Sequence, residues 1–92
     1  MDPKKLYKIT VKGRVQGVGF RQACLREARY RGLSGFVKNN SDGSVSIEAV
    51  GNSEHLNELV AWCQKGPGYG SVEEVTVEHH PPVNYNSFIV RY

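Results

Sequence analysis

A glycine-rich stretch, residues 13–21, lies between a pattern typical of a strand and a pattern typical of a helix. Gly13, Gly17 and Gly19 let successive backbone N–H groups turn toward one point, because glycine adopts positive φ without steric cost. Such a concave array binds anions, and the unsatisfied N–H groups at the start of the following helix add to it. Arg21 lies in the first turn of that helix, where a guanidinium can hold two phosphate oxygens at once. The stretch therefore predicts a phosphate-binding loop.

The spacing of this loop does not fit the common nucleotide-binding motifs. It lacks the Gly-Lys-Ser/Thr ending of a nucleotide P-loop, and its glycine gaps do not match the dinucleotide fingerprint. The loop alone leaves a second interpretation open, in which the glycines only make a tight turn from strand to helix and Arg21 is an exposed helix charge.

Length and cysteine content limit the possible classes of protein. With 92 residues the chain is expected to form one domain, residues 1–92, in which residues 1–5 are a mobile tail. Cys24 and Cys63 are far apart in the sequence, so neither a zinc knuckle nor a Cys-x-x-Cys pair is available. We expect reduced thiols in the core, with a disulfide between two helices as the alternative. No apolar run reaches the length of a membrane span and no leader pattern precedes Tyr7, so we expect a cytoplasmic protein without membrane contact.

The net charge of +3 hides an uneven distribution along the chain. Residues 1–38 carry ten Lys or Arg and two acids, whereas residues 39–92 carry two basic residues and seven acids. If folding keeps the two halves apart, the loop lies in a positive field that attracts small anions. The alternative is that these charges are solvated side chains on a helix face and an edge strand.

Two helical and five strand-like patterns follow one another without a repeat or a linker. Alternating apolar residues predict strands over 6–12, 35–39, 45–49, from 72 to the prolines at 81–82, and over 88–92. Apolar residues at helical spacing predict helices over 20–31 and from Asn52 or Ser53 to Lys65. Asp42-Gly43 predicts a hairpin between the second and third strands.

This order predicts an α+β fold. Strands with one apolar face and helices with one apolar stripe fit a ferredoxin-like sandwich (βαββαβ), in which one antiparallel sheet has both helices on one face. The architecture alone does not reveal a function, because RNA binders, metal chaperones and enzymes share it.

Two segments carry a family resemblance. Residues 13–21 resemble the first signature of the acylphosphatase family, and residues 35–45 resemble the second. The similarity spans nearly the whole chain and includes the aromatic ending at residues 88–92. It implies a small, free-standing acylphosphatase, an acylphosphate phosphohydrolase that cleaves the carboxyl-phosphate anhydride bond to give carboxylate and inorganic phosphate.

The resemblance also implies a site. By position, Arg21 would bind the phosphate and Asn39 would orient the attacking water. The phosphate would otherwise be held mainly by backbone N–H groups of the loop, those of Val15, Gln16, Gly17, Val18, Gly19 and Phe20. No cofactor or metal is implied. From the sequence alone, Asn39 could instead be a turn residue that starts the hairpin, and the Arg14 side chain could face solvent.

The residue types agree with this chemistry. A carboxylate leaves without a general acid, because the pKa of its conjugate acid is about 4. Phosphoryl transfer spreads charge over three oxygens, so positioning and electrostatic stabilisation by amides and one arginine are sufficient. The two signatures contain no paired carboxylates, no His dyad and no Cys or Ser nucleophile beside a base. The proton of the attacking water could pass to the phosphate itself.

Two other functions remain open from the sequence. One is a binding module for acyl or carbamoyl phosphate without turnover, as in the acylphosphatase-like domain of hydrogenase maturation proteins. The other is a nucleic-acid binder of the same fold, although residues 45–47 offer no aromatic stacking platform. His79-His80 are expected at the surface rather than on a metal, because adjacent strand residues point to opposite faces. We expect a monomer whose partners are a small acyl phosphate and inorganic phosphate, without nucleic acid.

Overall fold

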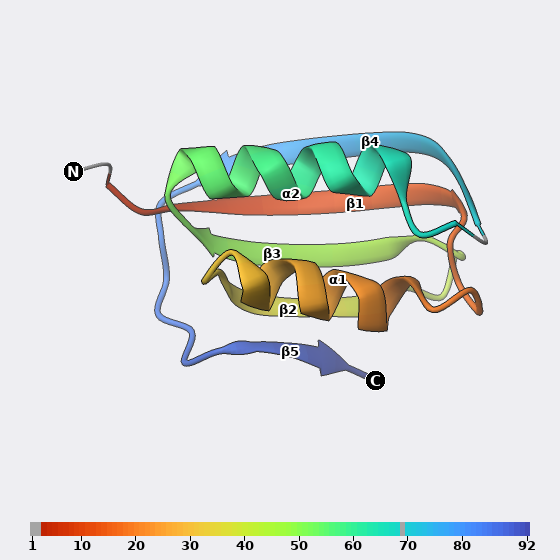
Figure 1. Cartoon of the computed structure of the whole chain (residues 1–92), viewed down its shortest axis with the longest axis horizontal. Helices are drawn as coiled ribbons and strands as arrows, with labels where there is room; N and C mark the ends of the chain where they lie inside the picture. The colour runs from red at the N-terminus through yellow and green to blue at the C-terminus, as the bar shows by residue number, and fades with distance from the viewer. Residues whose placement is uncertain (1–2, 69) are drawn as a thin grey trace.

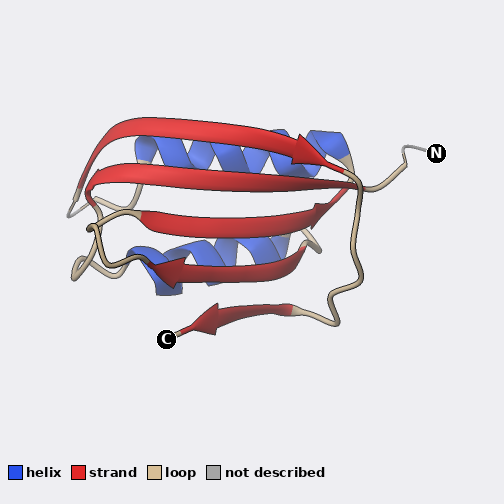
Figure 2. Cartoon of the chain, turned by 180° about the vertical axis from the view of Figure 1, so that it is seen from behind, coloured by secondary structure: helices blue, strands red, loops and turns tan. Residues whose placement is uncertain are grey.

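The computed structural model describes residues 3–68 and 70–92, which form a five-stranded sheet and two helices. In chain order the elements are β1 (Lys5–Arg14), α1 (Phe20–Tyr30), β2 (Ser34–Asn39), β3 (Val45–Gly51), α2 (Ser53–Lys65), β4 (Ser71–His80) and β5 (Phe88–Arg91). Both helices cover the same face of the sheet and leave the other face free of helices (Figures 1 and 2). The predicted ferredoxin-like α+β class is confirmed.

The strand order in the sheet is β4-β1-β3-β2-β5. The four longer strands pair antiparallel, as predicted, whereas β5 pairs parallel with β2. After β4 the chain crosses the end of the sheet and begins β5 at the end where β2 also begins (Figure 1). The sheet as a whole is therefore mixed, which the antiparallel expectation did not include for the last strand.

The core lies between the sheet and the helices. β1 contributes Tyr7, Ile9 and Val11, which alternate with more exposed residues as the pattern predicts. The buried residues of the two helices follow the predicted stripes and comprise Phe20, Ala23, Cys24, Ala28, Leu56, Leu59 and Cys63. Both cysteines are free and buried, as expected. Burial raises the pKa of the Cys63 thiol to about 12 and raises that of Cys24 as well.

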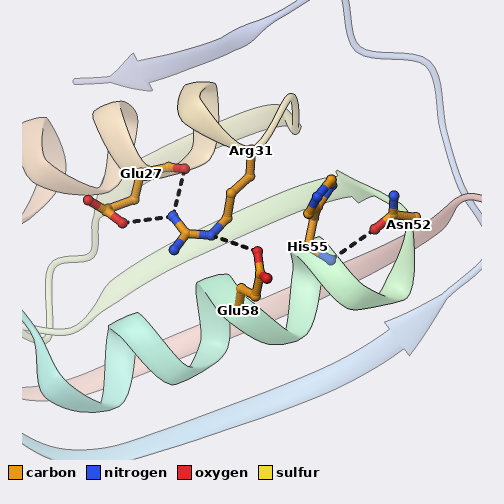
Figure 3. A network of polar contacts seen from close by, with 5 residues as sticks. All are labelled: Glu27, Arg31, Asn52, His55 and Glu58. Atoms are coloured by element: carbon orange, nitrogen blue, oxygen red, sulfur yellow. Dashed lines mark hydrogen bonds and ion pairs between the residues drawn. The ribbon is translucent and has the colours of Figure 1, made fainter.

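A polar network joins the two helices on the outer side of this layer (Figure 3). Arg31 Nη1 donates to Glu27 O at 3.0 Å and to Glu27 Oε1 at 2.7 Å, and Arg31 Nε donates to Glu58 Oε1 of α2 at 3.3 Å. Asn52 caps α2, because its Oδ1 accepts from the His55 backbone N–H at 2.9 Å. This cap confirms one of the two residues predicted to begin the second helix.

The first strand is longer than predicted at both ends. Lys5 is the first residue of β1 and pairs with Gly51, so the expected tail does not include Lys5; Met1 and Asp2 of that tail lie outside the described residues. Gly13 belongs to β1 rather than to the loop, and the register with β4 shifts between Lys12 and Gly13. Pairing with β3 extends β1 at its beginning, and pairing with β4 extends it at its end.

The helix-free face of the sheet carries a small apolar cluster of its own. Leu6, Phe36 and Val50 are at most 5% exposed there, although no helix covers them. Tyr85, from the connection between β4 and β5, packs edge-on against the Phe36 ring at 6.0 Å and donates to Glu48 Oε1 at 2.6 Å. The β4–β5 connection therefore covers part of this face through Tyr85.

The uneven charge distribution of the sequence does not survive on the sheet. Lys8 lies between Glu48 and Glu78 in the register of the three strands, and Lys12 pairs with Glu74 at 3.8 Å. Within the described residues, no helix has both the length and the apolar character that crossing a membrane requires.

Candidate active site

A cavity of about 130 Å³ opens at the N-terminal end of α1, beside the C-terminal ends of β2 and β5. Its walls come from four parts of the chain and comprise Val15, Gly17, Gly19, Phe20, Arg21, Gln22, Asn39 and Tyr92. Arg21 and Asn39, separated by 18 positions, thus face the same space because β2 ends where α1 begins. A phosphate group fits this volume.

The loop before α1 is shaped for an anion. Gly17 and Gly19 adopt φ of +75° and +80°, the left-handed region that glycine enters without strain. Gly19 is the N-cap of α1, yet none of the described side chains caps the helix, and its first turn holds no acid. Among the described residues, no acceptor lies in hydrogen-bonding geometry for the backbone N–H groups of residues 15–22. These N–H groups and the positive end of the helix dipole are available to a negatively charged ligand.

Among the described residues that line the cavity, Arg21 alone has a positive side chain. It forms no ion pair with a described carboxylate. Its guanidinium carbon instead lies 4.8 Å from the centre of the Tyr92 ring, an arrangement that orients the charge without neutralising it. A guanidinium left without a carboxylate partner is ready to bind a phosphate in a bidentate manner.

Asn39 is the last residue of β2 and pairs with Val45 of β3. Its side-chain oxygen Oδ1 is buried and has no hydrogen-bond partner among the described residues. A buried acceptor without a partner costs about 1–3 kcal/mol, so such groups are rare and need an explanation. Because Asn39 also lines the cavity, its amide can hydrogen-bond to a water that enters there.

Two residues of the predicted loop turn their side chains elsewhere. Gln16 and Val18 are not among the described residues that line the cavity. The Gln16 amide donates to two carbonyls of the β2–β3 turn, and Val18 packs against the core. The backbone role expected for Gln16 and Val18 therefore stays a prediction, whereas the other expected loop residues, Val15, Gly17, Gly19 and Phe20, do line the cavity. Arg14 ends β1, is exposed and does not line the cavity either.

Gln22 and Tyr92 line the cavity but were not among the predicted site residues. Gln22 follows Arg21 in the first helical turn, so its sequence position could have suggested a place at the rim. Tyr92 belonged to the aromatic ending of the family, which carried no chemical role. Its approach depends on the parallel pairing of β5 with β2, which local sequence patterns do not encode.

The two histidines predicted at the surface lie on β4. His79 stacks on Tyr7 with ring centroids 4.4 Å apart, and His80 Nε2 lies 3.0 Å from Glu78 Oε1. In residues 3–68 and 70–92, no group of three or more His, Cys, Asp or Glu side chains is arranged to hold a metal ion.

Comparison with known proteins gives a consistent result. The family model for acylphosphatase matches residues 7–90. An acylphosphatase from Synechococcus sp. (strain CC9311) is 42% identical over 88 residues, covering 96% of this chain and 98% of the relative. The crystal structure of the Bacillus subtilis acylphosphatase has a TM-score of 0.93 at 37% identity, covering 96% of this chain and 99% of that one. A full-length HypF in its phosphate- and nucleotide-bound form has a TM-score of 0.92 at 26% identity, covering all of this chain and 12% of that one. The chain belongs to the acylphosphatase family.

Proposed function

We propose that this protein hydrolyses the carboxyl-phosphate anhydride bond of small acyl phosphates, giving a carboxylate and inorganic phosphate. The N–H groups of residues 15–20 and the Arg21 guanidinium hold the phosphoryl group, and Asn39 orients the attacking water. One observation carries this proposal: Asn39, whose buried Oδ1 has no partner among the described residues, lines the same cavity as a helix N-terminus without a side-chain cap and an arginine without a carboxylate.

The reaction needs little from the protein beyond charge and orientation. In the transition state, negative charge spreads over the three phosphoryl oxygens, which N–H donors and a guanidinium stabilise. The bond from phosphorus to the acyl oxygen breaks, and its electron pair leaves with the carboxylate. Because this leaving group is a weak base, the reaction proceeds without a general acid. None of the described lining residues is a carboxylate or an imidazole, which fits a reaction of this kind.

Asn39 provides the direction of attack. Its Oδ1 accepts one O–H of the water, which points a lone pair of the water oxygen toward phosphorus. As the new oxygen–phosphorus bond forms, the water proton moves to a phosphoryl oxygen, so the protein needs no separate base. Holding the water in a near-attack position is a substantial part of the rate enhancement that this mechanism requires.

We also propose that the protein acts as a cytoplasmic monomer that binds no nucleic acid. The free, buried cysteines are typical of a reducing compartment. The outward residues at the middle of the sheet, Thr10 and Ser46, are small and polar rather than aromatic stacking surfaces.

The test is hydrolysis of benzoyl phosphate in the presence of EDTA by the native chain, Arg21→Ala and Asn39→Ala. Each variant is expected to lose about 2–4 kcal/mol of transition-state stabilisation, a decrease of about 30-fold to 1,000-fold in kcat/KM. Arg26→Ala and Asn86→Ala are matched controls, because these residues are exposed and lie outside the cavity. Both controls should retain native activity.

The likeness to HypF, solved with phosphate and nucleotide bound, favours one second candidate, a module that binds the acyl phosphate without cleaving it. A native chain that binds inorganic phosphate but does not turn over benzoyl phosphate would support the binding module. A chain that does neither would overturn the assignment of the loop as a phosphate site.

A further inference from the structure

We infer that the Gln16 side chain is a positioning residue: it fixes the distance between the phosphate loop and the hairpin that carries Asn39. This inference rests on the proposed function, because it assigns the means by which the water-orienting amide is kept in register with the bound phosphate. The backbone role of Gln16 in the loop does not require its side chain.

The side chain forms two hydrogen bonds to the same turn. Gln16 Nε2 donates to Asn40 O at 2.7 Å and to Ser44 O at 2.9 Å. These carbonyls lie at the beginning and the end of the turn between β2 and β3, so one amide group bridges the two ends of the turn. Asn40 directly follows Asn39, and a shift of the turn therefore moves Asn39 as well.

The turn itself is stiff. Asn40 N donates to Ser44 O at 2.8 Å, and Asn40 Nδ2 donates to Ser44 Oγ at 2.9 Å and to Ser46 Oγ at 2.7 Å. The Asp42 carboxylate accepts from Ser44 N and Ser44 Oγ at 3.0 Å and 2.6 Å. A turn cross-linked in this way moves as one body, so its position relative to the loop depends on its outer contacts.

The Asn39 side chain forms no hydrogen bond with another described residue that would hold it in place. Its Oδ1 is without a partner among the described residues, so its location follows from the backbone of β2 and from the adjoining turn. Gln16 provides the described side-chain link between that turn and the loop. The phosphate contacts of the loop and Arg21, by contrast, lie on the α1 side of the cavity and do not pass through this link.

This division predicts a selective kinetic effect. Displacing a reacting water by about 1 Å costs on the order of 100-fold in rate, whereas phosphate binding by amides and Arg21 is preserved. Replacing Gln16 by methionine keeps the length of the side chain and removes both donors. We expect kcat for benzoyl phosphate to fall about 10-fold to 100-fold, with the inhibition constant of inorganic phosphate changing less than about threefold.

The experiment measures kcat, KM and phosphate inhibition for Gln16→Met, Asn39→Ala and the double variant, with Gln64→Met as the control. Gln64 is exposed on α2 and lies outside the cavity and the turn. If Gln16 acts through Asn39, its replacement should have little further effect on kcat in the Asn39→Ala background. Circular dichroism and thermal unfolding check that each variant folds. Gln16→Glu, which has the same shape but two acceptors facing the carbonyls, is measured as a second variant in case Gln16→Met does not fold.

Three results would overturn the inference while leaving the proposed function intact. These are an unchanged kcat in folded Gln16→Met, a parallel loss of kcat and phosphate affinity, and a full additional loss of kcat in the Asn39→Ala background. The last two would mean that the side chain shapes the loop rather than placing the water. Failure of the native chain to hydrolyse the substrate would instead overturn the proposed function, and with it the positioning role of the Gln16 side chain.

Discussion

The guanidinium carbon of Arg21 lies 4.8 Å from the centre of the Tyr92 ring, which brings the end of β5 against the first turn of α1. Gln22 Nε2 adds a long contact of 3.5 Å to the Tyr92 hydroxyl. Although Tyr92 is 94% exposed, its ring forms part of the cavity wall. The ring limits the directions in which Arg21 can point and leaves its N–H donors free for a ligand.

Removing this ring should therefore weaken phosphate binding slightly. An exposed cation–π contact is worth about 0.5–1 kcal/mol, so Tyr92→Ala should raise the inhibition constant of inorganic phosphate about twofold to fivefold. Tyr92→Phe keeps the ring and should remain within twofold of the native value. Inhibition of benzoyl phosphate hydrolysis by phosphate gives both numbers. Equal inhibition constants for Tyr92→Ala and the native chain would mean that Arg21 is held by the helix alone.

The site residues that could be predicted from the sequence are those that act through local geometry. Gly17, Gly19 and Arg21 lie within five positions at the entry to α1, so their types and spacing predicted an anion site that the second signature then favoured over a plain turn. Tyr92 could not be found in the same way, because it reaches the cavity only through long-range pairing of β5. The two hydrogen bonds of the Gln16 side chain depend on two carbonyls of a distant turn, and no residue pattern encodes the position of these carbonyls.

The fold followed the alternation of apolar residues and deviated where tertiary contacts override it. The stripes of both helices and the hairpin pair β2–β3 came out as expected, since one buried face fixes strand register. Phe36 is buried on the face that carries no helix, because Tyr85 from a remote connection covers it. Such covering by a loop leaves no periodic trace in the sequence.

Position 35 requires glycine, because a side chain there would clash with the neighbouring strand. Gly35 adopts φ of +139°, and a Cβ there would overlap the backbone of Glu48 on the neighbouring strand β3. We expect Gly35→Ala to lower the free energy of unfolding by about 3 kcal/mol or more, because the strands would have to separate. Gly43→Ala is the matched control: its φ is +95° but the space around it is open, so the cost should be about 1–2 kcal/mol. Urea unfolding of both variants checks the difference, and similar losses would show that only φ matters.

Arg31 links the two helices through the contacts with Glu27 and Glu58 (Figure 3). Its side chain is 17% exposed, so the pairs are partly shielded from solvent and salt. Arg31→Ala should lower the free energy of unfolding by about 1–2 kcal/mol, since it removes a close ion pair and a bond to the Glu27 carbonyl. Glu58→Gln, which weakens only the longer pair at 3.3 Å, should cost less than about 0.5 kcal/mol. Chemical unfolding at low and at high salt measures the loss of stability of each variant. An Arg31→Ala variant as stable as the native chain would contradict the helix-linking role.

The Asp42 carboxylate makes the stability of the β2–β3 turn depend on pH. Hydrogen bonds from the Ser44 hydroxyl and the Ser44 backbone N–H lower the pKa of Asp42 below its ordinary value. Because the carboxylate titrates lower in the folded state than in the unfolded state, its contribution to stability is present above pH 4 and disappears as the pH falls through the folded pKa. Asp42→Asn should therefore be less stable than the native chain at pH 7, and the difference should shrink as the pH falls to 3. Ser44→Ala, which removes the main cause of the shift, should also reduce the dependence. Urea unfolding across this range tests the link, and variants that lose stability with acid as steeply as the native chain would show that the Asp42–Ser44 pair does not contribute to holding the turn.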